Sequence, residues 1–135
     1  MPHLTVRATE PQLAGREAAL ITALTEAVVT VYGEWARPLV VVRLDAVPTG
    51  RWAVGGRIVE DEGAAPEVQF GIRAGALSRP DGKDIARRLV AAVTDAVAGA
   101  LGAQVRETVV VELVPQPDDR VGVGGTLVSD AAAPS

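Results

Sequence analysis

The stretch Leu39-Val40-Val41-Val42-Arg43-Leu44 is the strongest indication of the fold, because residues 108–113 repeat its pattern as Thr-Val-Val-Val-Glu-Leu. Runs of β-branched residues of this length favour strands. Before each run lies a segment with apolar residues at helical spacing, and that segment is followed by a glycine, Gly33 or Gly102. The chain therefore predicts one unit used twice, in which a helix leads into a strand.

The duplication extends well beyond this stretch. Residues 11–56 align with residues 80–125 without a gap. Many matches are Val, Ala or Gly, yet their order and spacing are kept, so we interpret the chain as a tandem repeat. The identical pairs are Pro11/Pro80, Leu20/Leu89, Ala23/Ala92, Thr25/Thr94, Ala27/Ala96, Val28/Val97, Gly33/Gly102, Arg37/Arg106, Val40/Val109, Val41/Val110, Val42/Val111, Leu44/Leu113, Arg51/Arg120, Val54/Val123, Gly55/Gly124 and Gly56/Gly125.

The first unit is expected to run from about residue 2 to about residue 60. Residues 4–7 alternate apolar and polar side chains, as a strand with one buried face does. A helix is expected over residues 12–32, a strand over residues 39–44 and a short hairpin or edge segment over residues 51–60.

Residues 61–66 are expected to link the units, and the second unit, about 67–128, repeats the scheme. Its strands are expected at about 67–76 and 107–114, and its helix at about 81–101. Strand–helix–strand units with parallel strands give an α+β fold in which a four-stranded sheet carries both helices on one face.

We expect a single domain over residues 1–128, followed by a small, polar, flexible tail over residues 129–135. The runs Val40–Val42 and Val109–Val111 are apolar at consecutive positions, so both faces of those strands favour burial. Nothing else in the chain is left to cover the second face. Self-association is therefore expected.

Composition excludes several classes of function. The 135 residues include no cysteine and one histidine, His3, so thiol catalysis, a Ser-His-Asp triad and a His-rich metal site have little to be built from. The net charge is −4 and no basic block stands out, which argues against nucleic acid as a partner. No apolar run reaches the ~18–20 residues that cross a bilayer, and no signal peptide is evident, so we expect a cytoplasmic protein with no membrane partner.

These features together resemble the tautomerase superfamily, which includes 4-oxalocrotonate tautomerase, malonate semialdehyde decarboxylase and macrophage migration inhibitory factor. Met1-Pro2 opens directly onto a strand, the β-α-β unit is duplicated, and Gly50–Gly56 (Gly-Arg-Trp-Ala-Val-Gly-Gly) is similar to the family's Gly-x-aromatic-Gly-x-Gly-Gly stretch. Ala53 replaces one glycine of that stretch. Leu77-Ser78-Arg79-Pro80 is similar to the decarboxylase branch. The resemblance covers nearly the whole chain and implies a barrel-like homotrimer.

The resemblance also implies that Met1 is removed and that Pro2 becomes an N-terminal secondary amine. Such an amine can accept a proton, and an apolar pocket near arginines lowers its pKa towards neutrality. In related decarboxylases and dehalogenases the same nitrogen stays protonated and acts as an acid. The sequence leaves both regimes open.

Family substrates are mostly carboxylates, so arginines are expected around Pro2. The positions of the two substrate arginines of 4-oxalocrotonate tautomerase fall here on Gln12, with Asp81 in the second unit, and on Val40–Val41. This departure disfavours 4-oxalocrotonate itself as the substrate. The candidates for binding a substrate carboxylate are, in order, Arg79, Arg73 and Arg43, and each could instead be a solvated or interface charge.

Trp52 occupies the family's aromatic position and is expected to wall the pocket, or else to pack in the core or an interface. Tyr32 and Trp35, at the end of the first expected helix, are expected to pack there, and the resemblance implies that this region often lines the family's pocket. The implied function is enol–keto tautomerisation of a small 2-oxo acid by Pro2, without cofactor or metal. The alternatives are a decarboxylase or hydratase of a three-carbon oxo acid that uses protonated Pro2, and a non-catalytic trimeric binding protein.

Overall fold

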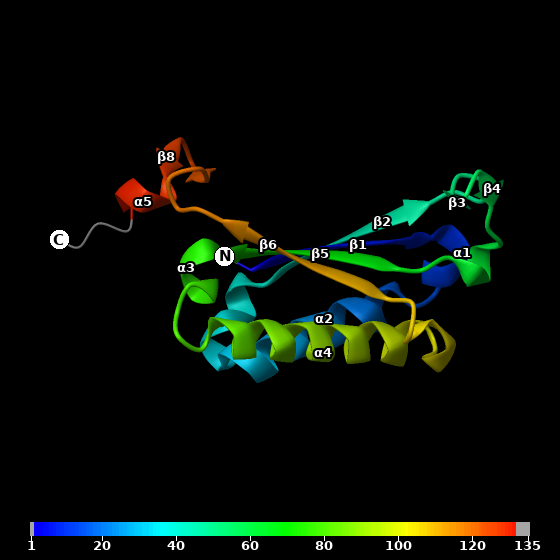
Figure 1. Ribbon diagram of the computed structural model, residues 1–135, viewed down its shortest axis with the longest axis horizontal. Coiled ribbons are helices and arrows are strands. Elements are labelled where there is room, and N and C mark those ends of the chain that lie inside the picture. The colour runs from blue at the N-terminus through cyan, green and yellow to red at the C-terminus, as the bar shows by residue number, and fades with distance from the viewer. Residues whose placement is uncertain (1, 132–135) are drawn as a thin grey trace.

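The computed structural model describes residues 2–131, and its centre is a mixed sheet of four strands in the order β2-β1-β5-β6 (Figure 1). The strands are β1 (His3–Thr9), β2 (Val41–Val47), β5 (Glu67–Arg73) and β6 (Val110–Gln116). β1 and β2 are parallel, as are β5 and β6, while β1 and β5 meet antiparallel in the middle. The two long helices, α2 (Glu17–Tyr32) and α4 (Gly82–Leu101), cover one face, as the sequence predicts.

Shorter elements complete the two units. Within residues 2–131, no helix combines the length and the low charge needed to cross a lipid bilayer. The hairpins β3–β4 and β7–β8 project from opposite ends of the molecule (Figure 1). The short elements are α1 (Glu10–Leu13), η1 (Glu34–Leu39), β3 (Ala53–Val54), β4 (Arg57–Ile58), η2 (Asp61–Gly63), α3 (Ala74–Leu77), η3 (Ala103–Val105), β7 (Gly122–Val123), β8 (Thr126–Leu127) and α5 (Val128–Ala131).

Three predicted boundaries were wrong. The helix expected over residues 12–32 is broken between α1 and α2, where Gly15 has a φ of +79° that a helix interior does not allow. The strand expected from Leu39 begins at Val41, because residues 34–39 form the 3-10 helix η1. Residues 74–76, expected to continue a strand, form most of α3. The expected tail begins inside α5 with residues 129–131, and residues 132–135 lie outside the described residues.

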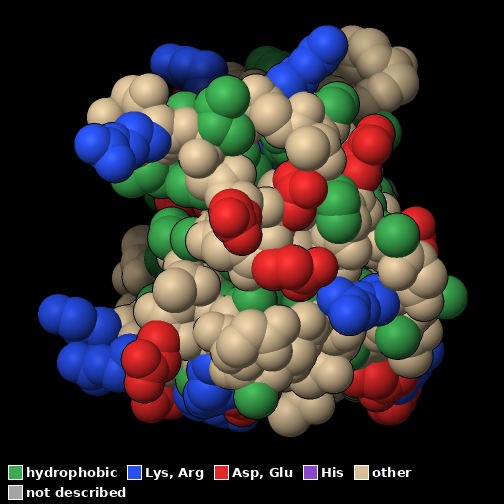
Figure 2. Space-filling view, turned by 90° about the vertical axis from the view of Figure 1, so that its right-hand side faces the viewer, with side chains coloured by type: hydrophobic (Ala, Val, Ile, Leu, Met, Phe, Trp, Pro, Cys, Tyr) green, Lys and Arg blue, Asp and Glu red, His purple; other side chains and the backbone are tan. Residues whose placement is uncertain are grey.

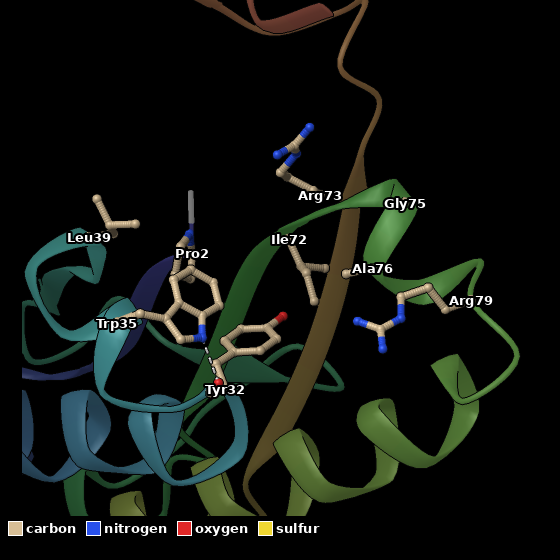
Figure 3. A pocket seen from close by; sticks show the side chains of 9 residues that line it. All are labelled: Pro2, Tyr32, Trp35, Leu39, Ile72, Arg73, Gly75, Ala76 and Arg79. Carbon is tan, nitrogen blue, oxygen red and sulfur yellow. Dashed lines mark hydrogen bonds between the residues drawn. The ribbon is translucent and has the colours of Figure 1, made fainter. Parts of the chain in front are cut away.

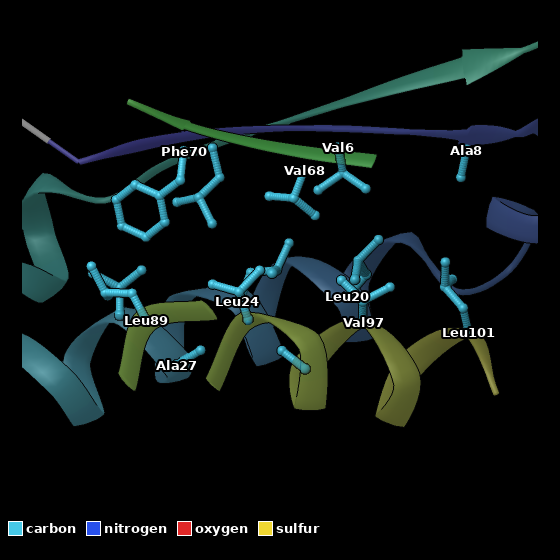
Figure 4. Packing of buried hydrophobic residues seen from close by; sticks show 14 of the residues in the cluster. Val6, Ala8, Leu20, Leu24, Ala27, Val68, Phe70, Leu89, Val97 and Leu101 are labelled. Carbon is cyan, nitrogen blue, oxygen red and sulfur yellow. The ribbon is translucent and has the colours of Figure 1, made fainter. Parts of the chain in front are cut away.

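The core lies between the sheet and the two long helices (Figure 4). Alternate residues of the central strands, among them Val6 in β1 and Phe70 in β5, point towards the helices and are fully buried. They meet one apolar stripe of α2 and one of α4, each with residues at helical spacing. The fully buried members include Leu4, Val6, Leu20, Leu24, Val28, Val68, Phe70, Leu89, Val93 and Val97.

The opposite face of the sheet is more polar than predicted. His3, Thr5 and Arg7 of β1 point there, and Arg7 lies 3.4 Å from Asp45 of β2. Gln69 of β5 donates to Glu112 of β6 at 3.2 Å on the same face. The valines expected to make this face apolar occupy it only on the edge strands, because alternate residues of each Val run point to the helix side.

The two units are related by main-chain hydrogen bonding as well as by sequence. The amide of Val41 donates to the carbonyl of Pro2 at 3.1 Å, and the amide of Val110 donates to the carbonyl of Pro66 at 3.0 Å. Each first strand has seven residues and leads into a four-residue helix. Pro66 is therefore the structural counterpart of Pro2.

The strand pairing shows that the ungapped alignment of residues 11–56 with residues 80–125 is wrong at its N-terminal end. α4 has 20 residues and α2 has 16, so the two units fall out of step before their long helices. Pro11 and Pro80 are consequently not equivalent. The counterpart of Gln12 in the second unit is Ala76, and not Asp81.

Candidate active site

A pocket of about 510 Å³ opens at the end of the sheet where the chain begins (Figure 3). Both units contribute to it: the start of β1 and the end of α2 with η1 from the first, and the end of β5 with α3 from the second. Most of the lining is apolar, and two arginines supply the charge. The lining residues are Pro2, Tyr32, Trp35, Leu39, Ile72, Arg73, Gly75, Ala76 and Arg79.

Pro2 lies at the buried inner side of this pocket. Its carbonyl accepts the hydrogen bond from Val41, which fixes the start of β1 against β2. Ile72 of β5 lies across the cavity, and Leu39 of η1 lies beside Pro2 (Figure 3). A proline nitrogen held at this place is surrounded mainly by carbon, which disfavours a charged form.

An aromatic wall stands next to Pro2. The indole Nε1 of Trp35 donates to the main-chain carbonyl of Tyr32 at 2.8 Å, and the two ring centroids are 6.0 Å apart. The Tyr32 ring points into the cavity with its hydroxyl group (Figure 3). Burial raises the pKa of Tyr32, so the phenol stays neutral and can donate a hydrogen bond near neutral pH.

An ion-pair network fixes the element that carries this wall. Arg37 of η1 contacts Glu34 at 2.9 Å and Glu26 of α2 at 2.5 Å. The hydrogen bonds from Arg37 hold the pKa of both carboxyl groups below the ordinary value. The second unit repeats the link between Arg106 and Asp95. η1 is thereby tied to α2, and Trp35 with it.

Arg73 and Arg79 form the cationic side of the pocket. The guanidinium of Arg79 points towards Tyr32 and Ile72, whereas that of Arg73 points away from them (Figure 3). Each is paired with an aspartate outside the lining set: Arg73 Nε lies 3.0 Å from Asp118, and Arg79 Nε lies 3.2 Å from Asp81. The structure thus brings together Pro2 and two of the three predicted arginines.

Arg43 and Trp52 are not among the lining residues. Arg43 is opposite Thr5 in the β1–β2 register and therefore lies on the outer face of the sheet. Trp52 precedes β3 in the hairpin at the far end of the molecule, where its carbonyl accepts from Val59 at 2.9 Å. A single copy of the chain does not place either residue beside Pro2.

Tyr32 and Trp35 were predicted mainly to pack, in a region that the family often uses to line its pocket, and Leu39 was predicted only as part of a strand. The available signal was their position just before and after Gly33, where the first long helix ends. The residues that follow α2 lie beside Pro2 because β2, the next strand in the chain, pairs with β1. Their proximity to Pro2 therefore depends on this strand pairing.

The equivalent end of the second unit, around Pro66, is filled. Gln12 is 1% exposed, and its Nε2 donates to the carbonyl of Ala64 at 2.8 Å. Thr9 Oγ1 donates to the carbonyl of Asp61 at 3.1 Å. These bonds draw the linker across the end of the sheet that corresponds to the Pro2 pocket. Acidic side chains gather in the middle of the end face that carries β3–β4 (Figure 2), which disfavours a carboxylate ligand there.

Comparison with known proteins agrees with this architecture. The model of the family described as tautomerase enzyme matches residues 2–62, which contain Pro2 and the aromatic wall. The comparison with curated proteins gives no match.

Solved structures match both units. Native fused 4-OT has a TM-score of 0.78 at 25% identity, and a fused 4-OT wild type asymmetric trimer has 0.79 at 21%; both cover 97% of this chain and 99% of theirs. Pt0534 inactivated by 2-oxo-3-pentynoate has a TM-score of 0.74 at 21% identity, covering 97% of this chain and 99% of that one. N1, a member of the cis-3-chloroacrylic acid dehalogenase family, has 0.68 at 22%, covering 93% and 82%.

The chain thus has the duplicated β-α-β fold of the fused 4-OT structures, with a pocket at its first strand. The tautomerase family model matches the first unit and the likeness to fused 4-OT extends over both units, which confirms the resemblance to the tautomerase superfamily found in the sequence.

Proposed function

We propose that the protein is a cofactor-independent enol–keto tautomerase of a small 2-oxo acid, with the amine of Pro2 as its proton carrier after removal of Met1. The observation that carries this proposal is the position of Pro2, buried in an apolar pocket that also holds two arginines. A secondary amine in such surroundings has its proton affinity lowered towards the neutral range, where it can both take and return a proton.

In the proposed reaction, Pro2 nitrogen takes the proton of the enol hydroxyl at C2 of the substrate. The C2–O bond becomes a carbonyl, and C3 receives the proton from the prolyl ammonium. Arg79 binds the carboxylate and polarises the neighbouring oxygen, which stabilises the negative charge that develops there. Trp35 and Tyr32 exclude water from the amine.

A structural relative supports the substrate class. Pt0534 is inactivated by 2-oxo-3-pentynoate, which is itself a 2-oxo acid with an electrophilic alkyne. A secondary amine at the same place in this chain would add to such an alkyne. We therefore use this compound as a probe of Pro2.

A second candidate keeps the site but changes the reaction. N1 is a member of the cis-3-chloroacrylic acid dehalogenase family, so this fold also occurs in a dehalogenase family. A protonated Pro2 could then act as an acid in a hydratase, a dehalogenase or a decarboxylase of a three-carbon acid. Product identification by NMR separates these reactions from tautomerisation.

The expected assembly is a homotrimer, as in the fused 4-OT neighbours. Its support in this chain is the pair of projecting hairpins, which expose Val54, Ile58, Val123 and Leu127. Surfaces of this kind favour contacts between copies. In such an assembly a hairpin of one copy could bring Trp52 to the Pro2 pocket of another. A cytoplasmic location stays a prediction from the sequence.

The test of the proposed function is turnover of phenylenolpyruvate, followed by ultraviolet absorbance, in wild-type protein and in Pro2→Ala. Intact mass must first show that Met1 is absent from both, so that both have a free N-terminal amine. We expect Pro2→Ala to lose at least about 100-fold in kcat/KM, because the secondary amine is lost. Equal turnover in the two proteins would contradict the role of Pro2.

Labelling gives an independent test. Incubation with 2-oxo-3-pentynoate should add one equivalent per chain, and peptide mapping should place it on Pro2. Retained Met1 in the purified protein, with no label and no turnover, would instead favour a non-catalytic binding protein.

A further inference from the structure

We propose that Asp118 restricts this pocket to substrates with a single carboxylate and an apolar remainder, by occupying the guanidinium of Arg73. This inference deepens the proposed function and rests on it. It concerns a residue outside the pocket lining that acts through Arg73, so Asp118 is a specificity-determining residue and not a catalytic one.

The pairing of Arg73 with Asp118 is bidentate and uses the edge of the guanidinium that carries Nε and Nη2. Nε lies 3.0 Å from Oδ1, and Nη2 contacts Oδ2 as well. This bidentate geometry is the one in which arginine binds a carboxylate most strongly. The Asp118 side chain is 35% exposed, the lowest value for an acidic partner among the described ion pairs. Arg73 lowers the pKa of Asp118, so the pair stays charged at neutral pH.

Asp118 is also held by its main chain. Its carbonyl accepts a hydrogen bond from the amide of Ser129 at 2.9 Å, which ties the turn after β6 to α5. The main-chain position of Asp118 beside Arg73 is therefore fixed by a hydrogen bond that does not involve its carboxylate. Arg73 is thus the less available of the two pocket cations.

Arg79 is the more available cation. Its contacts with Asp81 are 3.2 and 3.3 Å long, and its side chain is 63% exposed. Such an exposed pair stabilises little, so a substrate carboxylate can replace Asp81 at low cost. The guanidinium already points into the cavity (Figure 3).

The charges of the pocket decide the substrate class. The charges of the two arginines are balanced by those of Asp118 and Asp81. A substrate that replaces Asp81 on Arg79 therefore has a binding position for one carboxylate. A second carboxylate would find no free cation in the pocket, since Arg73 is held by Asp118 and the wall opposite Arg79 is mostly apolar (Trp35, Leu39 and Ile72), and burying an unpaired charge is strongly unfavourable. An aromatic or aliphatic chain fits the same wall well.

The experiment uses two ligands that differ by one carboxylate, cinnamate and 4-carboxycinnamate, with affinities measured by calorimetry at one ionic strength. The variants are Asp118→Asn and the neighbouring control Asp119→Asn. Asp119 is matched to Asp118 in type and position, but it pairs with Arg120 at 3.0 Å and lies outside the pocket lining. Phenylenolpyruvate turnover is measured in parallel on each protein.

We expect wild-type protein to prefer cinnamate by about tenfold or more, because the second carboxylate has no free cation. Asp118→Asn should reduce this preference at least about fivefold by freeing Arg73, and Asp119→Asn should leave it unchanged. Equal affinities in the wild type, or the same preference in Asp118→Asn as in the wild type, would overturn the inference. If the proposed function is wrong but this inference is right, the wild-type protein will not turn over phenylenolpyruvate but will still prefer cinnamate to 4-carboxycinnamate.

Discussion

Gly82, the first residue of α4, lies directly against the main-chain carbonyl of Leu77, the last residue of α3. A Cβ at Gly82 would be 2.0 Å from the Leu77 oxygen, closer than any non-bonded carbon can approach. Gly82 also donates its amide to the carbonyl of Arg79 at 2.9 Å. The turn that carries Arg79 into the pocket therefore closes only with glycine at this position.

Gly82→Ala should destabilise the protein by about 2 kcal/mol or more, because the obstructing atom is main chain and the turn must move. Since Arg79 moves with it, KM for a carboxylate substrate should rise as well. Gly99→Ala is the matched control, because Gly99 lies in the same helix with nothing within 4 Å of an added Cβ. That change should be neutral or stabilise by ~0.5–1 kcal/mol. Chemical denaturation of both variants checks this, and equal stabilities would show that α3 and α4 separate easily.

Arg37→Ala should loosen η1 and raise KM about threefold through Trp35, with little change in stability because the pairs are exposed. Arg106→Ala provides the comparison: Arg106 makes the repeated contact to Asp95 in the second unit, away from the pocket. Its KM should equal that of the wild type. Steady-state kinetics on phenylenolpyruvate decide the matter, and a common effect of both changes would mean that the network acts only on overall stability.

The same network predicts a pH dependence of stability. Hydrogen bonds from Arg37 hold the pKa values of Glu26 and Glu34 below those of the unfolded chain. The stabilisation is therefore present at neutral pH and is lost as the pH falls through the lowered values. The difference in Tm between wild type and Arg37→Ala should shrink from about pH 7 to about pH 3. A difference that grows in acid would contradict this assignment.

Trp35→Ala should raise KM for phenylenolpyruvate about three- to tenfold, because the substrate ring loses an aromatic surface worth ~0.5–1.5 kcal/mol. Trp35→Phe, which keeps a ring, should recover most of the affinity. A smaller 2-oxo acid without a ring should be less affected by either change. Unaltered KM in Trp35→Ala would place the substrate elsewhere in the pocket.

Ile58→Lys combined with Leu127→Lys should dissociate the expected trimer, since each charge falls on the apolar strand of a projecting hairpin. Val90→Lys is the control: Val90 is also an exposed apolar residue, but it lies on the long helix α4 and not on a hairpin. Sedimentation should report monomers for the double variant and the wild-type mass for Val90→Lys. A wild-type protein that already sediments as a monomer would rule out the assembly.

The order of the main strands and helices could be predicted because each unit carries two strong periodic patterns. Alternation in residues 4–7 and helical spacing in α2 and α4 follow directly from burial on one face. The break at Gly15 and the 3-10 helix before β2 could not, because these turns depend on main-chain hydrogen bonds, from Arg16 to Leu13 and from Ala36 to Gly33, that residue types alone do not reveal.

Pro2, Arg73 and Arg79 of the candidate pocket were predicted from the sequence, whereas the contribution of Trp35 depends on how the chain folds. Pro2, Arg73 and Arg79 come together because β1 and β5 are antiparallel neighbours. Trp35 depends on η1 turning back over Pro2. The ungapped alignment of the two units was wrong in one respect. It did not allow for the longer start of α4, so it matched Gln12 to Asp81 and not to Ala76.

The filled end around Pro66 shows what duplication has done to the two halves of the chain. A single polypeptide has one N-terminus, so only one of its two proline-led strands can offer a free amine. The first half then supplies Pro2 and the aromatic wall of the pocket, and the second half supplies its arginines. The two repeats thus contribute different residues to one pocket, and neither repeat contains the complete set.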